Sequence, residues 1–133
     1  AMERFHRAGV RVTCFISPIF PGITDVKAII RRVKNICNLI WLENLNLRGG
    51  FRTEIFDFIR REYPHLISLY HEIDREGRSD KWRVLDEEIR VFAAEEGLDY
   101  AVADDTLRRP FDAPPLIVNW FFHEQVRRTA KKR

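Results

Sequence analysis

The sequence predicts an α/β fold in which a small parallel sheet of about three strands is packed by helices. Three observations lead to this fold class. Short runs rich in β-branched and aromatic residues, typical of buried strands, recur along the chain. Amphipathic helical patterns stand between these runs, and Pro or Gly marks many of the boundaries. The order strand, helix, strand near the start predicts a parallel pair.

The composition is typical of one soluble domain covering residues 1–133. The 133 residues are 45% hydrophobic and 32% charged, with a formal net charge of +3. No apolar stretch approaches the roughly 18 to 20 residues that a membrane span requires, and no signal-peptide pattern opens the chain. We therefore expect a cytoplasmic protein without a membrane partner. Ala1 precedes Met2, the only methionine, so we interpret Met2 as the encoded start.

The first strong patterns predict a βαβ unit. A strand is expected over 10–16, and a second short strand over 39–44. Between them, apolar residues spaced three and four apart predict a helix over 25–36, with Thr24 or Asp25 as its N-cap. The two strands should be adjacent and parallel, joined by a right-handed crossover.

Three more helical patterns and one more strand complete the prediction. The helices are expected over 52–62, 65–76 and 80–96. An apolar run begins behind Pro114 and Pro115 and ends near His123, which predicts the third strand. No internal repeat or linker divides the chain.

The segment ISPIFPGITD, residues 16–25, carries more rigid backbone than an ordinary strand-to-helix turn needs. Pro18 and Pro21 fix their own φ angles, while Gly22 can adopt a positive φ. We therefore predict an ordered bend at the carboxyl end of the first strand. Ligands of parallel sheets collect beyond the carboxyl ends of the strands, so this bend is a candidate wall of a binding site.

Polar residues gather at the predicted carboxyl ends of the strands. They are Ser17 on the first strand, Glu43, Asn44, Asn46 and Arg48 on the second, and Asn119, His123 and Glu124 on the third. With free N–H groups at the start of helix 25–36, they could hold a carboxylate, a ribose or a phosphate. The alternative is that these residues only terminate strands and cap the next helix.

The sequence offers no metal site. Cys14 and Cys37 stand 23 positions apart without a CxxC pair, so we interpret them as reduced, buried residues. The segment HEIDR begins like the helix of a zinc protease, but Arg75 occupies the place of the second histidine.

The basic segment RRTAKKR, residues 127–133, is the densest cluster of cations. Such a segment can bind phosphates in a salt-dependent way. The alternative is a solvated segment without a partner.

Three stretches together resemble a known family: ISPIFPGITD, WLENLNLRG and IVNWFFHE. They look like the C-terminal part of radical S-adenosylmethionine proteins of the spore photoproduct lyase-like group, often labelled DNA repair photolyases. The resemblance covers nearly the whole chain. It implies a fragment of a partial (βα) barrel with a C-terminal extension. It also implies S-adenosylmethionine and a [4Fe-4S] cluster as cofactors of the intact enzyme.

The resemblance assigns roles to residues of this chain. Late barrel strands line the cofactor and substrate cavity in that family. This implies that Ser17, Pro18, Ile19, Glu43, Asn44 and Asn46 lie on the adenosyl side of the cofactor. It also implies that Arg48 and His123 face the substrate. The family's CxxxCxxC loop is absent, so the chain should not be catalytic alone, should bind neither cofactor alone, and has no assigned catalytic residue.

Three hypotheses of function follow. The first is the C-terminal portion of a radical S-adenosylmethionine enzyme, which needs a cluster-bearing N-terminal half as partner. The second is a stand-alone nucleic-acid-binding module that uses the basic segment. The third is a plain α/β domain without a ligand. A piece of a barrel leaves a strand edge uncovered, so we also expect a homo-oligomer formed through that edge.

Overall fold

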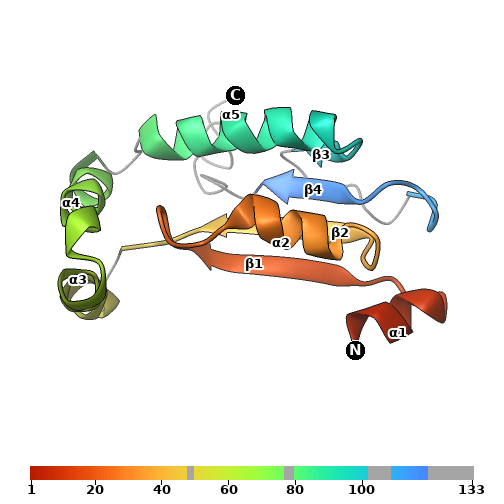
Figure 1. Cartoon of the computed structure of the whole chain (residues 1–133), viewed down its shortest axis with the longest axis horizontal. Helices are drawn as coiled ribbons and strands as arrows, with labels where there is room; N and C mark the ends of the chain where they lie inside the picture. Colours follow the sequence, from red (N-terminus) through yellow and green to blue (C-terminus); the bar gives the residue numbers. More distant parts are fainter. Residues whose placement is uncertain (48–49, 77–79, 102–108, 120–133) are drawn as a thin grey trace, which may run out of the picture.

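The protein contains a four-stranded parallel sheet, which confirms the predicted fold class. The computed structural model describes residues 1–47, 50–76, 80–101 and 109–119. The strands lie in the order β1-β2-β4-β3, and every neighbouring pair is parallel (Figure 1). Their bounds are Thr13–Ile19 for β1, Leu39–Asn44 for β2, Asp99–Ala101 for β3 and Leu116–Asn119 for β4.

The four helices expected over 25–36, 52–62, 65–76 and 80–96 are present, with ends that differ by at most three residues. The described helices are α1 (Met2–Arg7), α2 (Val26–Val33), α3 (Phe51–Glu62), α4 (Ile67–Glu76) and α5 (Asp80–Glu95), with a short 3-10 helix η1 (Pro64–Leu66) before α4. Asp25 is the N-cap of α2, because its Oδ1 accepts a hydrogen bond from the N–H of Ala28 at 3.0 Å. Across the described residues, none of the helices combines the length and the apolar character needed to cross a membrane.

The first strand differs from its prediction in position. It begins at Thr13 and continues to Ile19, whereas the sequence placed it over 10–16. The register with β2 becomes irregular between Ile16 and Ile19. Pro18 lies inside this irregular stretch, where the Ser17–Pro18 peptide bond is cis and proline has no N–H to donate to the ladder. The predicted bend therefore starts within the end of the strand.

The fourth strand is the element that the sequence did not predict. β3 has only three residues and therefore shows no recognisable alternation. It pairs with β4, which lies between β2 and β3, so the three predicted strands are neighbours and β3 adds an edge. β4 is described as far as Asn119, and the predicted continuation toward His123 lies outside the described residues.

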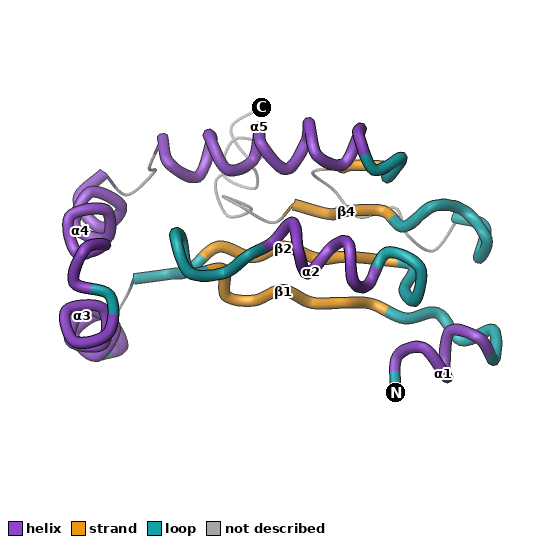
Figure 2. The backbone as a smooth tube through the Cα atoms, viewed as in Figure 1, coloured by secondary structure: helices purple, strands orange, loops and turns teal. Residues whose placement is uncertain are grey.

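The helices α2 and α5 lie side by side on one face of the sheet. Their contact includes Arg31, whose guanidinium carbon lies 4.9 Å from the centre of the Phe92 ring. Between these helices and the sheet lies a core of fully buried side chains that includes Ile30, Ile40 and Ile117. By contrast, α3 and α4 lie beyond the carboxyl ends of the strands, where ligands of parallel sheets collect (Figures 1 and 2).

Candidate functional site

The carboxyl edge of the sheet brings two of the predicted segments into contact. The hydroxyl of Ser17 donates a hydrogen bond to Oε2 of Glu43 at 3.2 Å. A little further along, Ile19 of β1 is in register with Asn44 of β2. The bend after β1 and the segment after β2 therefore meet at one end of the sheet, as the sequence predicted.

Ser17 and Glu43 lie on the sheet face opposite α2 and α5. Side chains alternate between faces along a strand, and the buried Ile16 and Leu42 point toward those helices. On the other face, Phe15 is 54% exposed, and its ring meets that of Trp41 edge-on at 5.9 Å between centres. We call Phe15, Ser17, Trp41 and Glu43 the open face.

The open face is unusual for a parallel sheet. Sheets of this kind normally have both faces covered, because their strands are apolar on both sides. Within the part of the chain that the structure describes, no helix packs over Phe15. An exposed aromatic ring beside a hydroxyl and a carboxylate can stack on a flat ring and hydrogen-bond to polar groups attached to it.

The bend after β1 is held from behind by the helices beyond the carboxyl edge. The buried Tyr70 of α4 donates its hydroxyl to the carbonyl oxygen of Pro21 at 3.0 Å. Gly22 has a φ of +76°, and the Leu66 side chain lies 3.0 Å from the position that a Cβ would occupy. Phe20 donates its N–H to Oγ1 of Thr24 at 2.9 Å. These contacts hold residues 20–24 in place.

The start of α2 is a less favourable anion site than the sequence suggested. The carboxylate of Asp25 already accepts the N–H of Ala28, and its charge repels a second anion at that helix end. Asp25 thus takes up one N–H of the helix start, and an anion held by the other N–H groups stays a prediction.

The remaining predicted site residues fall into three groups. Asn44 is half-buried beside the bend, and Asn46 is exposed. Pro18 is exposed, whereas Ile19 is only 1% exposed and its side chain belongs to the core. The third group, Arg48, His123 and Glu124, lies outside the described residues.

Asn119 takes part in a polar cluster that the sequence did not predict. Its amide donates to Oδ1 of Asp86 in α5 and, at 2.7 Å, to the hydroxyl of Tyr100 in β3. Tyr100 also donates to Asp86, and burial followed by this hydrogen bond raises the pKa of the phenol. Asn119 is in register with Leu42, so it lies on the helix-covered face, away from Ser17 and Glu43.

The sequence could not predict this cluster, because the strand β3 that carries Tyr100 was not predicted. Asn119 stood out as a polar residue at a strand end, but Asp86 and Tyr100 had no distinguishing pattern. The cluster ties α5 to two strands. Arg90 adds to it, because its guanidinium carbon lies 5.0 Å from the centre of the Tyr100 ring.

The cysteines of this chain do not suit an iron–sulfur cluster. Cys14 and Cys37 are both free, and burial raises the pKa of the Cys37 thiol to about 12. A [4Fe-4S] cluster is held by about four thiolates, and this chain contains two cysteines. Of the residues that the structure describes, no three or more His, Cys, Asp or Glu side chains gather as metal ligands.

Comparison with known proteins identifies one distant relative. The chain is 33% identical over 64 residues to the uncharacterized protein MJ0683 of Methanocaldococcus jannaschii. The match covers 48% of this chain and 24% of that protein, so the chain spans about a quarter of the length of its relative. No protein-family model matches the sequence. No solved structure matches it either.

Proposed function

We propose that this chain is the C-terminal portion of a radical S-adenosylmethionine enzyme of the spore photoproduct lyase-like group. In this proposal, the sheet is part of an incomplete (βα) barrel and its open face lines the cofactor and substrate cavity. The observation that carries the proposal is the 3.2 Å contact between Ser17 and Glu43 at the carboxyl edge. The contact joins the two segments that resemble the family's cofactor wall.

The chemistry of the open face suits an adenosyl group. The Glu43 carboxylate can accept hydrogen bonds from ribose hydroxyls or from an ammonium group, and the Ser17 hydroxyl can turn toward a ligand instead of Glu43. The exposed ring of Phe15 offers a surface on which an adenine can stack. Asn44 follows Glu43 and is in register with the buried Ile19, so alternation along β2 turns its side chain toward the helix-covered face, away from these groups.

The iron–sulfur cluster belongs to a different part of the proposed enzyme. This chain supplies only two thiols, both with raised pKa values, so the cluster-binding loop must come from an N-terminal half. The relative MJ0683 is longer than the stretch that it shares with this chain, since the match spans only 24% of its length. By this proposal the isolated chain is inactive, and it binds no stoichiometric iron after anaerobic reconstitution.

The cavity residues can be tested in two steps. The gene region upstream should encode a CxxxCxxC loop, either in the same reading frame or in an adjacent one. With that half present, Glu43→Gln and Ser17→Ala should each weaken S-adenosylmethionine binding by about 1 to 3 kcal/mol in equilibrium dialysis. Glu54→Gln on α3 is the matched control for the lost charge and should bind as the unchanged protein does.

Three results would contradict this proposal. They are iron bound in stoichiometric amount by the isolated chain, the absence of any cluster-bearing partner, and unchanged cofactor affinity in both variants. The proposed enzyme is cytoplasmic, since a reducing compartment keeps Cys14 and Cys37 as free thiols.

The second candidate is a stand-alone module that binds nucleic acid. What favours it is the exposed ring of Phe15 on the open face, because unpaired bases stack on such rings. The basic segment 127–133 would add salt-dependent contacts to phosphates. A gel shift with single-stranded DNA at several salt concentrations should then weaken in Phe15→Ala, while Phe51→Ala, which removes an exposed ring from α3, should have no effect.

A further inference from the structure

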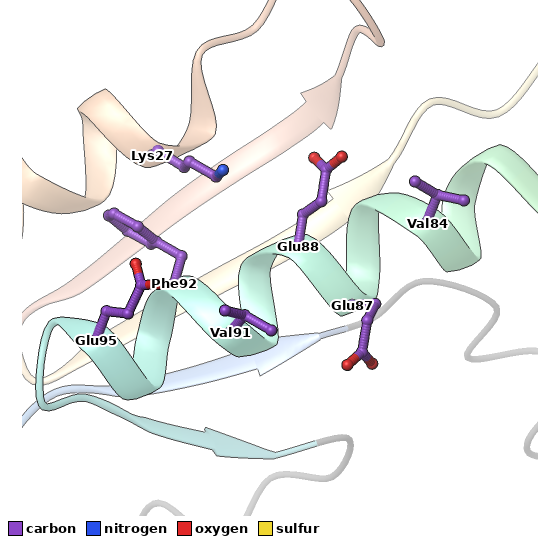
Figure 3. A pocket seen from close by; sticks show the side chains of 7 residues that line it. All are labelled: Lys27, Val84, Glu87, Glu88, Val91, Phe92 and Glu95. Atoms are coloured by element: carbon purple, nitrogen blue, oxygen red, sulfur yellow. The ribbon is translucent and has the colours of Figure 1, made fainter.

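A shallow groove of about 410 Å³ runs between α2 and α5 on the side away from the open face (Figure 3). Its apolar surface comes from Val84, Val91 and Phe92 of α5. Val84 and Val91 are 56% and 50% exposed, so the groove presents apolar side chains that nothing in the described residues covers. Two exposed valines two turns apart on one helix are a suitable surface for another segment of chain.

The α5 wall of this groove is acidic. Glu88 and Glu95 line it, and among the described residues neither carboxylate has an ion-pair partner. In Figure 3 the Glu88 carboxylate points toward the side where α2 lies, and Lys27 stands on the opposite wall. Glu87 also lines the groove, and its Oε2 lies 3.8 Å from Nε of Arg90. The chain as a whole carries a formal charge of +3, and the segment 127–133 alone contributes five positive charges to it.

We propose that the groove binds the basic segment 127–133 of the same chain. Five of the seven residues in RRTAKKR are Arg or Lys, which complements the unpaired carboxylates of Glu88 and Glu95. Val126 stands directly before the segment and supplies an apolar side chain for the exposed valines. The segment itself lies outside the described residues.

The chain is long enough to reach the groove. Asn119 is hydrogen-bonded to Asp86, which places the end of β4 against α5, one residue before Glu87. The seven residues 120–126 can span up to about 23 Å. Glu88 and Glu95 are two helical turns apart, about 10 Å along the axis of α5. The segment can therefore pass around α5 and lie along both carboxylates.

Docking would withhold the basic segment from phosphates. While its cations pair with Glu88 and Glu95, they cannot release counterions from a polyanion, so the groove and a polyanion compete for one segment. The groove would thus regulate any binding of nucleic acid by this protein. This inference does not depend on the proposed cofactor cavity, which lies on the other face of the sheet.

Carbodiimide cross-linking of the full chain tests the contact directly, because it joins carboxylates to nearby lysines. Lys34 and Glu96, 2.8 Å apart, supply the internal positive control. We expect the cross-link yield of Lys131 and Lys132 with Glu88 or Glu95 to exceed their yield with Glu54 about fivefold to tenfold. This is the preference that one or two exposed ion pairs would produce. Mixing isotope-labelled with unlabelled protein distinguishes bonds within a chain from bonds between chains.

A pair of variants with equal charge provides the second measurement. Glu88→Gln/Glu95→Gln should release the basic segment and elute from heparin at higher salt than Glu54→Gln/Glu62→Gln, which removes the same charge from α3. Equal elution of the two variants would overturn the proposal, as would cross-links without preference for the groove. Cross-links between chains would also overturn it, since the occupant would then be a second copy.

Discussion

At the scale of the residue, proline and glycine gave the most reliable predictions. Pro18, Pro21 and Gly22 predicted an ordered bend, and the structure shows that the bend is packed from behind by Leu66 and Tyr70. The role of Asn38 could not be predicted. Its amide joins the N–H of Val12 to the carbonyl of Phe111, partners that lie 26 and 73 positions away. Such a contact exists only after the chain has folded.

Gly22→Ala should destabilise the protein more than Gly97→Ala. Both glycines have a positive φ, at +76° and +69°, so each substitution should cost about 1 to 2 kcal/mol for the backbone alone. At Gly22 the new Cβ would also crowd Leu66 at 3.0 Å, whereas nothing lies within 4 Å at Gly97. This crowding should lower the free energy of unfolding by a further amount of about 1 kcal/mol or more, which urea denaturation measures. If the two variants lose the same free energy of unfolding, then the Leu66 side chain moves aside without cost.

Asn38→Ala should lower the free energy of unfolding by about 1 to 3 kcal/mol. Asn38 is 7% exposed, and its removal would leave the N–H of Val12 and the carbonyl of Phe111 without their 2.9 Å partners. Asn35→Ala is the matched control, because that side chain is exposed at the end of the α2 segment. If Asn38→Ala lowers the free energy of unfolding no more than Asn35→Ala does, then water replaces both hydrogen bonds of Asn38.

At the scale of the element, hydrophobic period located most helices and strands. The 3.6-residue pattern of residues 80–96 predicted α5 to within one residue at its end, and 39–44 matches β2. The hydrophobic period did not locate an element correctly where the element was short, as for β3, or where proline interrupted a strand, as in β1. How α2 attaches to α5 could not be predicted either. Glu96, just after α5, pairs with Arg31 and Lys34, more than 60 positions earlier in the chain.

The ion pairs of Glu96 make the stability of the protein depend on acid. The hydrogen bond from Lys34, followed by that from Arg31, lowers the pKa of Glu96 below its usual value. A lowered pKa contributes stability above the pKa of the unfolded chain, about 4.3, and this contribution is lost as the pH falls through the folded pKa. Glu96→Gln should therefore reduce the loss of stability on acidification from about pH 5 downward.

The test compares urea denaturation midpoints of Glu96→Gln and Glu54→Gln over that range. Glu54 is exposed on α3, and its substitution removes a carboxylate without removing these ion pairs. The slope of stability against pH should stay unchanged in Glu54→Gln. If Glu96→Gln keeps the full slope as well, then the acid sensitivity arises elsewhere. The Arg52–Asp74 pair, which lowers the pKa of Asp74, would then be the next candidate.

At the scale of the whole molecule, the sequence predicted the class of fold but not the order of all strands. The βαβ rule correctly placed β1 beside β2. In the observed order β1-β2-β4-β3, the last strand, β4, lies between β2 and β3, and β3 had not been predicted. The candidate site was predicted in part for the same reason. Ser17 and Glu43 meet because adjacent parallel strands end together, whereas Asn119 points to the opposite face because of a register that no local pattern encodes.

Among the strands that the structure describes, β1 stands at one edge of the sheet and pairs with β2 alone. Unpaired N–H and C=O groups of an edge strand can pair with another chain. Pro18 protects the end of this edge, because it has no N–H to offer, but Thr13 to Ser17 carry no such protection. The exposed ring of Phe15 adds apolar surface beside the same edge. We therefore predict dimers or larger homo-oligomers at high concentration.

Phe15→Lys should shift this equilibrium toward the monomer. A lysine on an edge strand opposes strand pairing by charge repulsion between copies and removes the apolar contact. Phe51→Lys makes the same chemical change at a 72% exposed ring on α3, far from the sheet edge, and should leave the equilibrium unchanged. Sedimentation velocity from micromolar to millimolar protein measures both. A monomer at every concentration in the unchanged protein would mean that the β1 edge is covered, and a larger effect of Phe51→Lys would place the self-association on α3.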